Sequence, residues 1–152
     1  MIQIKMLSRQ EEKFIATASY YATLSPMNNH HGCIVVLNGQ EIGAGYNNYR
    51  NYSRDKIISD CLSCHAEISA VRNAIKSEPN QRKIKKMKLY VVRLSDQGKY
   101  LDSKPCYNCH CRLSSLGIRN VTYSTGDDFI CMDLRRHCSG NVSTGYRYLR
   151  SL

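Results

Sequence analysis

The sequence lacks any long apolar run. No hydrophobic segment in its 152 residues approaches the roughly 20 residues of a membrane-spanning helix, so a transmembrane protein is excluded. The stretch 1–13 has no apolar core of the kind found in secretory signals, and we therefore expect a cytoplasmic location. Internal repeats, linkers and low-complexity segments are absent as well, which predicts a single domain over residues 1–152.

Acidic residues are scarce: 12 Asp and Glu stand against 22 Lys and Arg, which gives a formal net charge of +10. The excess lies in residues 72–93 and 135–150. Segments 82–88 and 135–150 are candidate contacts for nucleic acid, because basic side chains neutralise phosphates. The second segment also alternates tyrosine with arginine, a combination that can stack on single-stranded bases. A solvated basic surface is the alternative interpretation.

Cysteine, by contrast, is abundant, with eight residues in the chain. In a reducing compartment, clustered cysteines indicate metal binding or catalysis rather than disulfides. Two Cys-x-x-Cys pairs, Cys61/Cys64 and Cys106/Cys109, are each followed directly by a histidine. Cys33 lies in a short apolar segment, which is typical of a buried thiol that acts as a small core residue.

Helical and strand patterns alternate along the chain. A capping box at Ser8 to Glu11 begins a helix that Pro26 ends, and Asn38-Gly39 is typical of a two-residue hairpin turn. Strands are expected at 33–37, 40–46, 88–94 and 118–124, helices at 65–76 and 106–116, and a short element near 129–134. This alternation predicts an α/β layered domain with a mixed sheet.

The second Cys-x-x-Cys pair belongs to a larger pattern. His65-Ala-Glu67 is followed, after 37 intervening residues, by Pro105-Cys106-Tyr-Asn-Cys109, which is the H-x-E…P-C-x-x-C signature of zinc deaminases. One imidazole and two thiolates make a three-ligand zinc site with an open position for water. Glu67, two residues from His65 at a helix start, can then transfer protons without binding the metal.

Three other interpretations of the cysteines are weighed against this one. A structural zinc held by both Cys-x-x-Cys pairs leaves His65 and Glu67 unexplained and separates the pairs by 41 residues. Two c-type haem sites fit the Cys-x-x-Cys-His spacing, but haem attachment normally requires export. Buried thiols explain isolated cysteines but not a pair directly after a proline.

At these residues the chain resembles the cytidine deaminase superfamily. The resemblance spans about residues 34–125. It implies a three-layer fold, in which helices flank a mixed five-stranded sheet, with a catalytic core at about 30–125 and a basic tail at 126–152. It also implies Zn²⁺ as cofactor, Glu67 as the catalytic residue, His65, Cys106 and Cys109 as metal ligands, and a homo-oligomer.

Within the superfamily the chain is most similar to deoxycytidylate (dCMP) deaminases, through Gly45-Tyr46-Asn47 and a long polar loop before His65. This likeness implies hydrolysis of dCMP to dUMP with release of ammonia. It implies that Asn47 and the backbone around Ala66 hold the small-molecule nucleotide. For Asn47, a loop-capping role is the alternative.

The polar loop carries two further expectations. Some dCMP deaminases bind a second zinc there, which would here use His30, Cys33, Cys61 and Cys64. Basic loop residues are candidate phosphate contacts or part of a solvated loop; these are Arg50, Arg54 and Lys56.

Two other functions stay open. His65-Ala-Glu67-Ile68 also resembles tRNA adenosine deaminases, so the alternative enzyme acts on adenosine or cytidine in tRNA or another nucleic acid. A non-catalytic, zinc-stabilised nucleic-acid-binding module is the alternative outside the enzymes.

Overall fold

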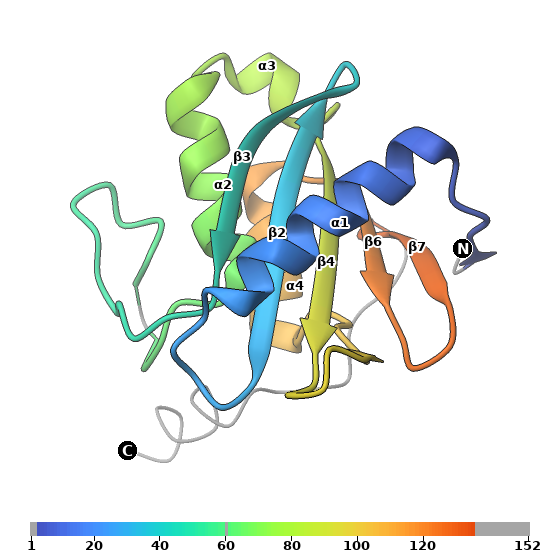
Figure 1. Ribbon diagram of the computed structural model, residues 1–152. Helices are drawn as coiled ribbons and strands as arrows, with labels where there is room; N and C mark the ends of the chain where they lie inside the picture. Colours follow the sequence, from blue (N-terminus) through green and yellow to red (C-terminus); the bar gives the residue numbers. More distant parts are fainter. Residues whose placement is uncertain (1–2, 60, 136–152) are drawn as a thin grey trace.

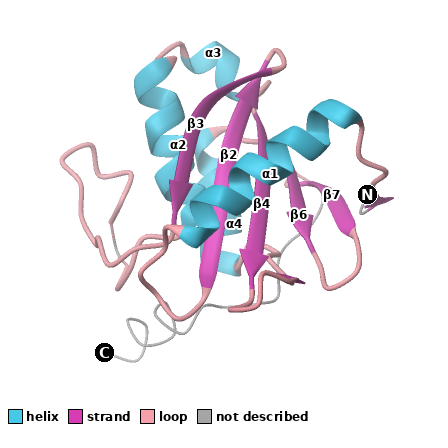
Figure 2. Ribbon diagram, viewed as in Figure 1, coloured by secondary structure: helices cyan, strands magenta, loops and turns pink. Residues whose placement is uncertain are grey.

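One mixed sheet runs through the molecule, and helices cover both of its faces (Figures 1 and 2). The computed structural model describes residues 3–59 and 61–135. The strands are β1 (Gln3–Ile4), β2 (His30–Leu37), β3 (Gln40–Tyr46), β4 (Lys88–Leu94), β5 (Tyr100–Leu101), β6 (Asn120–Ser124) and β7 (Phe129–Asp133). Their order is β1-β7-β6-β4-β2-β3, with β5 paired to β4. Only the β4–β6 pair, among the described strands, is parallel.

Four helices complete the described fold: α1 (Arg9–Thr23), α2 (Ala66–Ser77), α3 (Gln81–Ile84) and α4 (Tyr107–Leu116). In Figure 1, α1 crosses one face of the sheet, while α2 and α4 lie behind the other. The expected three-layer α/β arrangement is therefore confirmed. Its five longer strands are β2, β3, β4, β6 and β7, and two strands of two residues each are added at β1 and β5.

Side chains of β2 alternate between two hydrophobic clusters. Cys33 and Val35 pack in the cluster beneath α2 and α4, whereas Ile34 and Val36 pack with α1. A strand buried on both faces reads as a continuous apolar run, which is why residues 33–37 show no polar alternation. Burial raises the pKa of the Cys33 thiol well above its ordinary value, so Cys33 is a neutral core residue.

The local signals at the chain's first elements are confirmed. The Ser8 hydroxyl accepts a hydrogen bond from the Glu11 backbone N–H, and the Glu11 carboxylate accepts one from the Ser8 N–H. Asn38 and Gly39 both have positive φ angles, 51° and 77°, as a two-residue hairpin turn of this type requires. The turn fixes the register of β2 against β3.

Small residues of β3 allow α2 to lie directly on the sheet. A Cβ atom added at Gly43 would lie 2.5 Å from the Ala74 backbone N, and one at Gly45 would lie 2.6 Å from that of Ala70. Any larger side chain would push the helix away. These two glycines therefore let the backbone of α2 approach that of β3 closely, and this contact positions α2 on the sheet.

The basic segment 82–88 includes most of α3, a short helix that was not expected from the sequence, and continues to the first residue of β4. Arg82, Lys85 and Lys86 are exposed, whereas Ile84 and Met87 are buried and anchor the segment. Apart from Arg135, the other basic segment, 135–150, lies outside the described residues. No described helix has the length and apolar character needed to cross a membrane.

Candidate metal centre

Three metal-ligating side chains converge where α2 and α4 begin. His65 is the N-cap residue of α2, Cys106 is the N-cap residue of α4, and Cys109 lies in the first turn of α4. Their donor atoms lie within 4.8 Å of one another, and no other such group of three or more occurs in the described part of the chain. His65 Nδ1 is 3.0 Å from Cys109 Sγ and 3.7 Å from Cys106 Sγ.

The 3.7 Å between Cys106 and His65 is the separation of two ligands of one zinc ion, whereas the 3.0 Å between His65 and Cys109 is shorter, as in a direct hydrogen bond. Zinc bonds of about 2.3 Å to sulfur and 2.0–2.1 Å to nitrogen place tetrahedral ligands about 3.5–3.8 Å apart. Two thiolates and an imidazole are donors that zinc prefers, and three protein ligands leave a fourth position open. The residues present therefore match a catalytic rather than a closed structural zinc site.

The local electrostatics favour a thiolate at Cys106. Its side chain accepts hydrogen bonds from the Cys109 thiol, from His65 and from the Cys109 backbone N–H, which together lower the pKa of Cys106 to about 3. The same interaction and full burial raise the pKa of Cys109. A helix N-terminus adds partial positive charge beside both sulfurs, which stabilises the anionic form that a metal binds.

Glu67 lies in the first turn of α2, and only 4% of its surface is exposed. Burial raises the pKa of its carboxyl group, and the nearby His65 opposes that rise. The carboxyl group interacts with the Cys109 thiol, so it faces the metal ligands. A buried carboxyl group in this position can exchange protons with a ligand of the open metal site.

Asn47 and Asn48 fasten the chain after β3, Asn47 to the start of β2 and Asn48 to Cys64 before α2. The Asn47 side chain accepts a hydrogen bond from the His31 backbone N–H (2.9 Å) and donates one to the Asn29 carbonyl. Asn48 and Cys64 exchange two backbone hydrogen bonds, directly before His65. These contacts are those of a loop-capping asparagine, the alternative role considered for Asn47. A substrate contact from Asn47, or from the backbone at the buried Ala66, stays a prediction.

The structure does not bring together the four residues of the second metal site expected from the sequence, His30, Cys33, Cys61 and Cys64. His30 Nε2 contacts Asp96 at 3.2 Å, and the Cys33 side chain lies inside the core. Cys64 is buried behind the bridge to Asn48, and its thiol points at the His65 carbonyl. Cys61 belongs to no group of three or more metal-ligating side chains among the described residues. Cys33 is kept apart from the other three because it is a strand residue whose side chain lies in the sheet interior.

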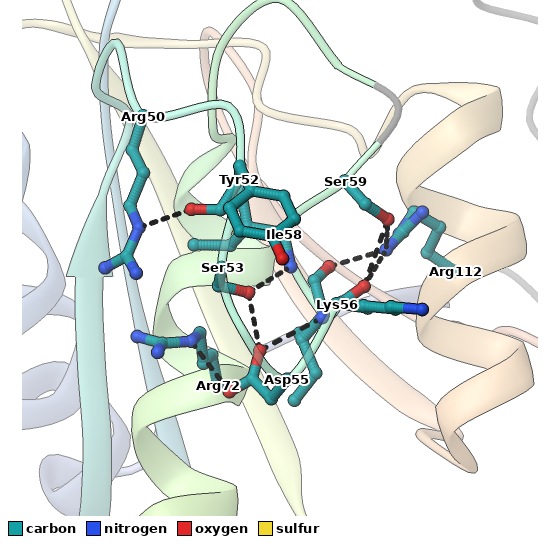
Figure 3. Close-up of polar contacts among 10 residues, drawn as sticks. Arg50, Tyr52, Ser53, Asp55, Lys56, Ile58, Ser59, Arg72 and Arg112 are labelled. Atoms are coloured by element: carbon teal, nitrogen blue, oxygen red, sulfur yellow. Dashed lines mark hydrogen bonds and ion pairs between the residues drawn. The ribbon is translucent and has the colours of Figure 1, made fainter.

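The loop between Arg50 and Ser59 is held by polar contacts from both neighbouring helices (Figure 3). Arg72 of α2 forms an ion pair with Asp55, with a distance of 2.9 Å from Nε to Oδ2. Arg112 of α4 donates hydrogen bonds to the carbonyl groups of Lys56 and Ile57 and to the Ser59 hydroxyl. The loop is therefore attached to the same two helices that present the metal ligands.

Two residues beside the centre were not anticipated from the sequence. His31 and Arg93 are register partners, near the beginning of β2 and the end of β4. Burial, the Arg93 charge and the His65 charge lower the pKa of His31 to about 4, so its imidazole is neutral at pH 7. Pairing across strands brought them together, and no sequence motif contains both.

The fold is shared with solved deaminase structures. A dCMP deaminase from the cyanophage S-TIM5, solved with dCMP and dUMP, superposes with a TM-score of 0.57 at 22% identity, covering 78% of this chain and 83% of that one. Cytidine deaminase from Burkholderia pseudomallei gives 0.58 at 18% identity, covering 84% and 94%. Guanine deaminase from Bacillus subtilis gives 0.52 at 20% identity, covering 78% and 65%. No curated protein matches the chain.

The fold and the His–Cys–Cys centre together define a zinc-dependent deaminase. Residues 8–125 match the family model of the cytidine and deoxycytidylate deaminase zinc-binding region, and the chain belongs to this family. His65, Cys106 and Cys109 are the residues of this chain that fit the zinc ion.

Proposed function

We propose that this protein hydrolyses the exocyclic amine of a cytosine nucleotide, with dCMP converted to dUMP and ammonia. The observation that carries the proposal is the buried Glu67 carboxyl group facing the three metal ligands. A structural zinc site needs no such group, because a buried carboxyl without an ion-pair partner is costly. The S-TIM5 dCMP deaminase, solved with dCMP and dUMP, supports this choice of substrate.

Each step can be assigned to a side chain. His65, Cys106 and Cys109 would hold zinc, which when bound supplies a Lewis acid that lowers the pKa of water towards about 7. Glu67 accepts a proton from the attacking water and delivers it to the pyrimidine ring nitrogen. It then passes a second proton to the departing amine, so that water and the amine become a carbonyl and ammonia.

The position of the basic segment 82–88 favours a small substrate over a nucleic acid. α2 begins at the metal centre and leads to α3 at its other end (Figure 1). Its 12 residues span roughly 18 Å at 1.5 Å per residue. A nucleic-acid strand bound to segment 82–88 would therefore contact the protein at the end of α2 that lies away from Glu67.

The test is product formation by the zinc-loaded protein, followed by chromatography, with Glu67→Gln as the matched control. We expect dUMP from dCMP with the wild type and a loss of at least about 100-fold in the variant. The same assay is run on a cytosine-containing single-stranded DNA and on a tRNA anticodon stem-loop. Deamination of an oligonucleotide but not of dCMP would refute the proposed substrate. Tight zinc with no turnover of any substrate would favour a binding module.

A further inference from the structure

Arg93 has no acidic partner among the described residues, and it lies on the sheet face that carries the metal centre. Leu89 and Val91 of β4 belong to the cluster beneath α2 and α4, so strand alternation places Arg93 on that same face. Its Nη2 donates to the Asn29 side chain at 2.9 Å. Its Nε is buried and has no hydrogen-bond partner, and no described carboxylate pairs with it.

Within residues 3–59 and 61–135, no carboxylate compensates the positive charge of Arg93. Arg72 and Arg135, by comparison, each pair with an aspartate. Partial burial of a guanidinium with an unpaired N–H costs free energy unless an anion or another acceptor reaches it. Asp96, the nearest acidic residue along the chain, is paired with His30 instead. The arrangement around Arg93 is therefore that of a binding group whose acceptor arrives with a ligand.

His31 connects this group to the metal centre. It faces Arg93 across the β2–β4 ladder, and its backbone N–H donates to Asn47. Asn47 is followed by Asn48, whose backbone exchanges two hydrogen bonds with Cys64, the residue directly before His65. Arg93 supplies a positive charge and His31 supplies a hydrogen-bonding side chain. This chain of contacts links Arg93 to the metal ligand His65 and places the anion-binding group at the same end of the strands as the metal centre.

We propose that Arg93, with His31 beside it, is the anion subsite of this active site and binds the 5′-phosphate of the substrate nucleotide. The inference rests on the proposed function and specifies a nucleoside monophosphate over a nucleoside. A guanidinium offers several N–H donors in one plane, which suits the oxygens of a phosphate monoester. The loop residues considered for this role fit less well, because Arg50, Arg54 and Lys56 are exposed and Arg50 Nε donates to the Tyr52 carbonyl.

The first test separates phosphate recognition from chemistry. Steady-state kinetics are measured with dCMP and with deoxycytidine for the wild type, Arg93→Ala and Arg93→Lys. We expect Arg93→Ala to raise KM for dCMP about 10–100-fold with kcat within about threefold, as for the loss of a charged hydrogen bond. Its kcat/KM for deoxycytidine should stay within about twofold. The KM of Arg93→Lys for dCMP should lie between those of the wild type and Arg93→Ala. Lys99→Ala removes an exposed charge in the turn after β4 and is the matched control. It should leave kcat and KM unchanged for both substrates.

An equal loss with both substrates would overturn the assignment, because it would make Arg93 a structural residue. An effect on an internal cytosine of single-stranded DNA, without one on dCMP, would overturn it too, because the anion would then be a backbone phosphodiester. Wild-type protein provides a check that needs no variant: inorganic phosphate should raise KM for dCMP and leave that for deoxycytidine unchanged.

A binding measurement distinguishes this inference from the proposed function. Calorimetry of dUMP and deoxyuridine binding is performed on zinc-loaded wild type and Arg93→Ala. If the wild type deaminates nothing, the proposed function fails, yet selective loss of dUMP binding in the variant still supports the anion subsite. Equal dUMP affinity in the two proteins would refute the subsite whether or not turnover is found.

Discussion

Gly45 lies at the closest approach of β3 to α2, and a single added methyl group there tests how the metal centre is positioned. A Cβ at residue 45 would lie 2.6 Å from the Ala70 backbone N and 2.6 Å from the Ser69 Oγ. Ordinary van der Waals contact begins at 3.4 Å, so the helix must retreat by 0.8 Å or more. The obstacle includes backbone, which cannot rotate away as a flexible side chain can.

The size of the effect follows from this contact. Overpacking in a well-packed interior costs about 1–3 kcal/mol, and a domain of this size loses about 2–4 °C of Tm per kcal/mol. We therefore expect Gly45→Ala to lower Tm by about 2–12 °C. The displaced residues lie one turn from His65 and Glu67, and Ser69 N–H donates to the His65 carbonyl. Zinc retention and turnover should fall together with stability.

Gly126→Ala is the matched control, because a Cβ at that position meets nothing within 4 Å. Urea unfolding of both zinc-loaded variants gives their free energies of unfolding, and we expect the control to stay within about 0.5 kcal/mol of the wild type. If Gly45→Ala also stays within that range and retains zinc, close packing of β3 on α2 does not position the metal centre.

Two further predictions concern the metal and the pH dependence of stability. Cys109→Ser should reduce zinc after dialysis from about one equivalent to below about 0.2, while Cys61→Ser keeps about one equivalent by elemental analysis; a loss in Cys61→Ser would restore the second site. Burial alone would raise the pKa of Glu11, but hydrogen bonds from Ser8, Tyr90 and Lys5 hold it below its ordinary 4.5. Glu11→Gln should therefore be less stable than wild type at pH 7, with the difference closing as pH falls below 4.5. A constant difference from neutral pH to pH 3 in urea titrations would contradict this reasoning.

The metal ligands were predictable because their signals are local. His65 and Cys106 each stand at a helix start, and the spacing from Cys106 to Cys109 places both sulfurs in one helical turn. The capping box and the Asn38-Gly39 turn are local in the same sense. Such patterns need only the residues within one turn, so the sequence alone determines them.

Features that depend on strand pairing were not predictable in this way. Arg93 meets His31 only through the β2–β4 register, across 62 residues of chain. The same pairing buries Cys33 and removes it from the expected second metal site. α3, with four residues, and β5, with two, were not predicted because such short elements have no detectable hydrophobic pattern. The basic tail and the homo-oligomer stay predictions.

The division between catalysis and substrate choice follows from how the site is held. Backbone contacts fix the catalytic part: the Asn48–Cys64 bridge holds the chain before His65, and Gly45 sets the height of α2 above the sheet. Residues 49–59 and 61–63 lie outside these contacts, and side chains attach this loop, chiefly Arg72 and Arg112. Changes in this loop can therefore alter the entrance to the site without moving the metal ligands. Arg93 belongs to β4 and not to this loop, so the proposed phosphate contact does not depend on the loop's sequence.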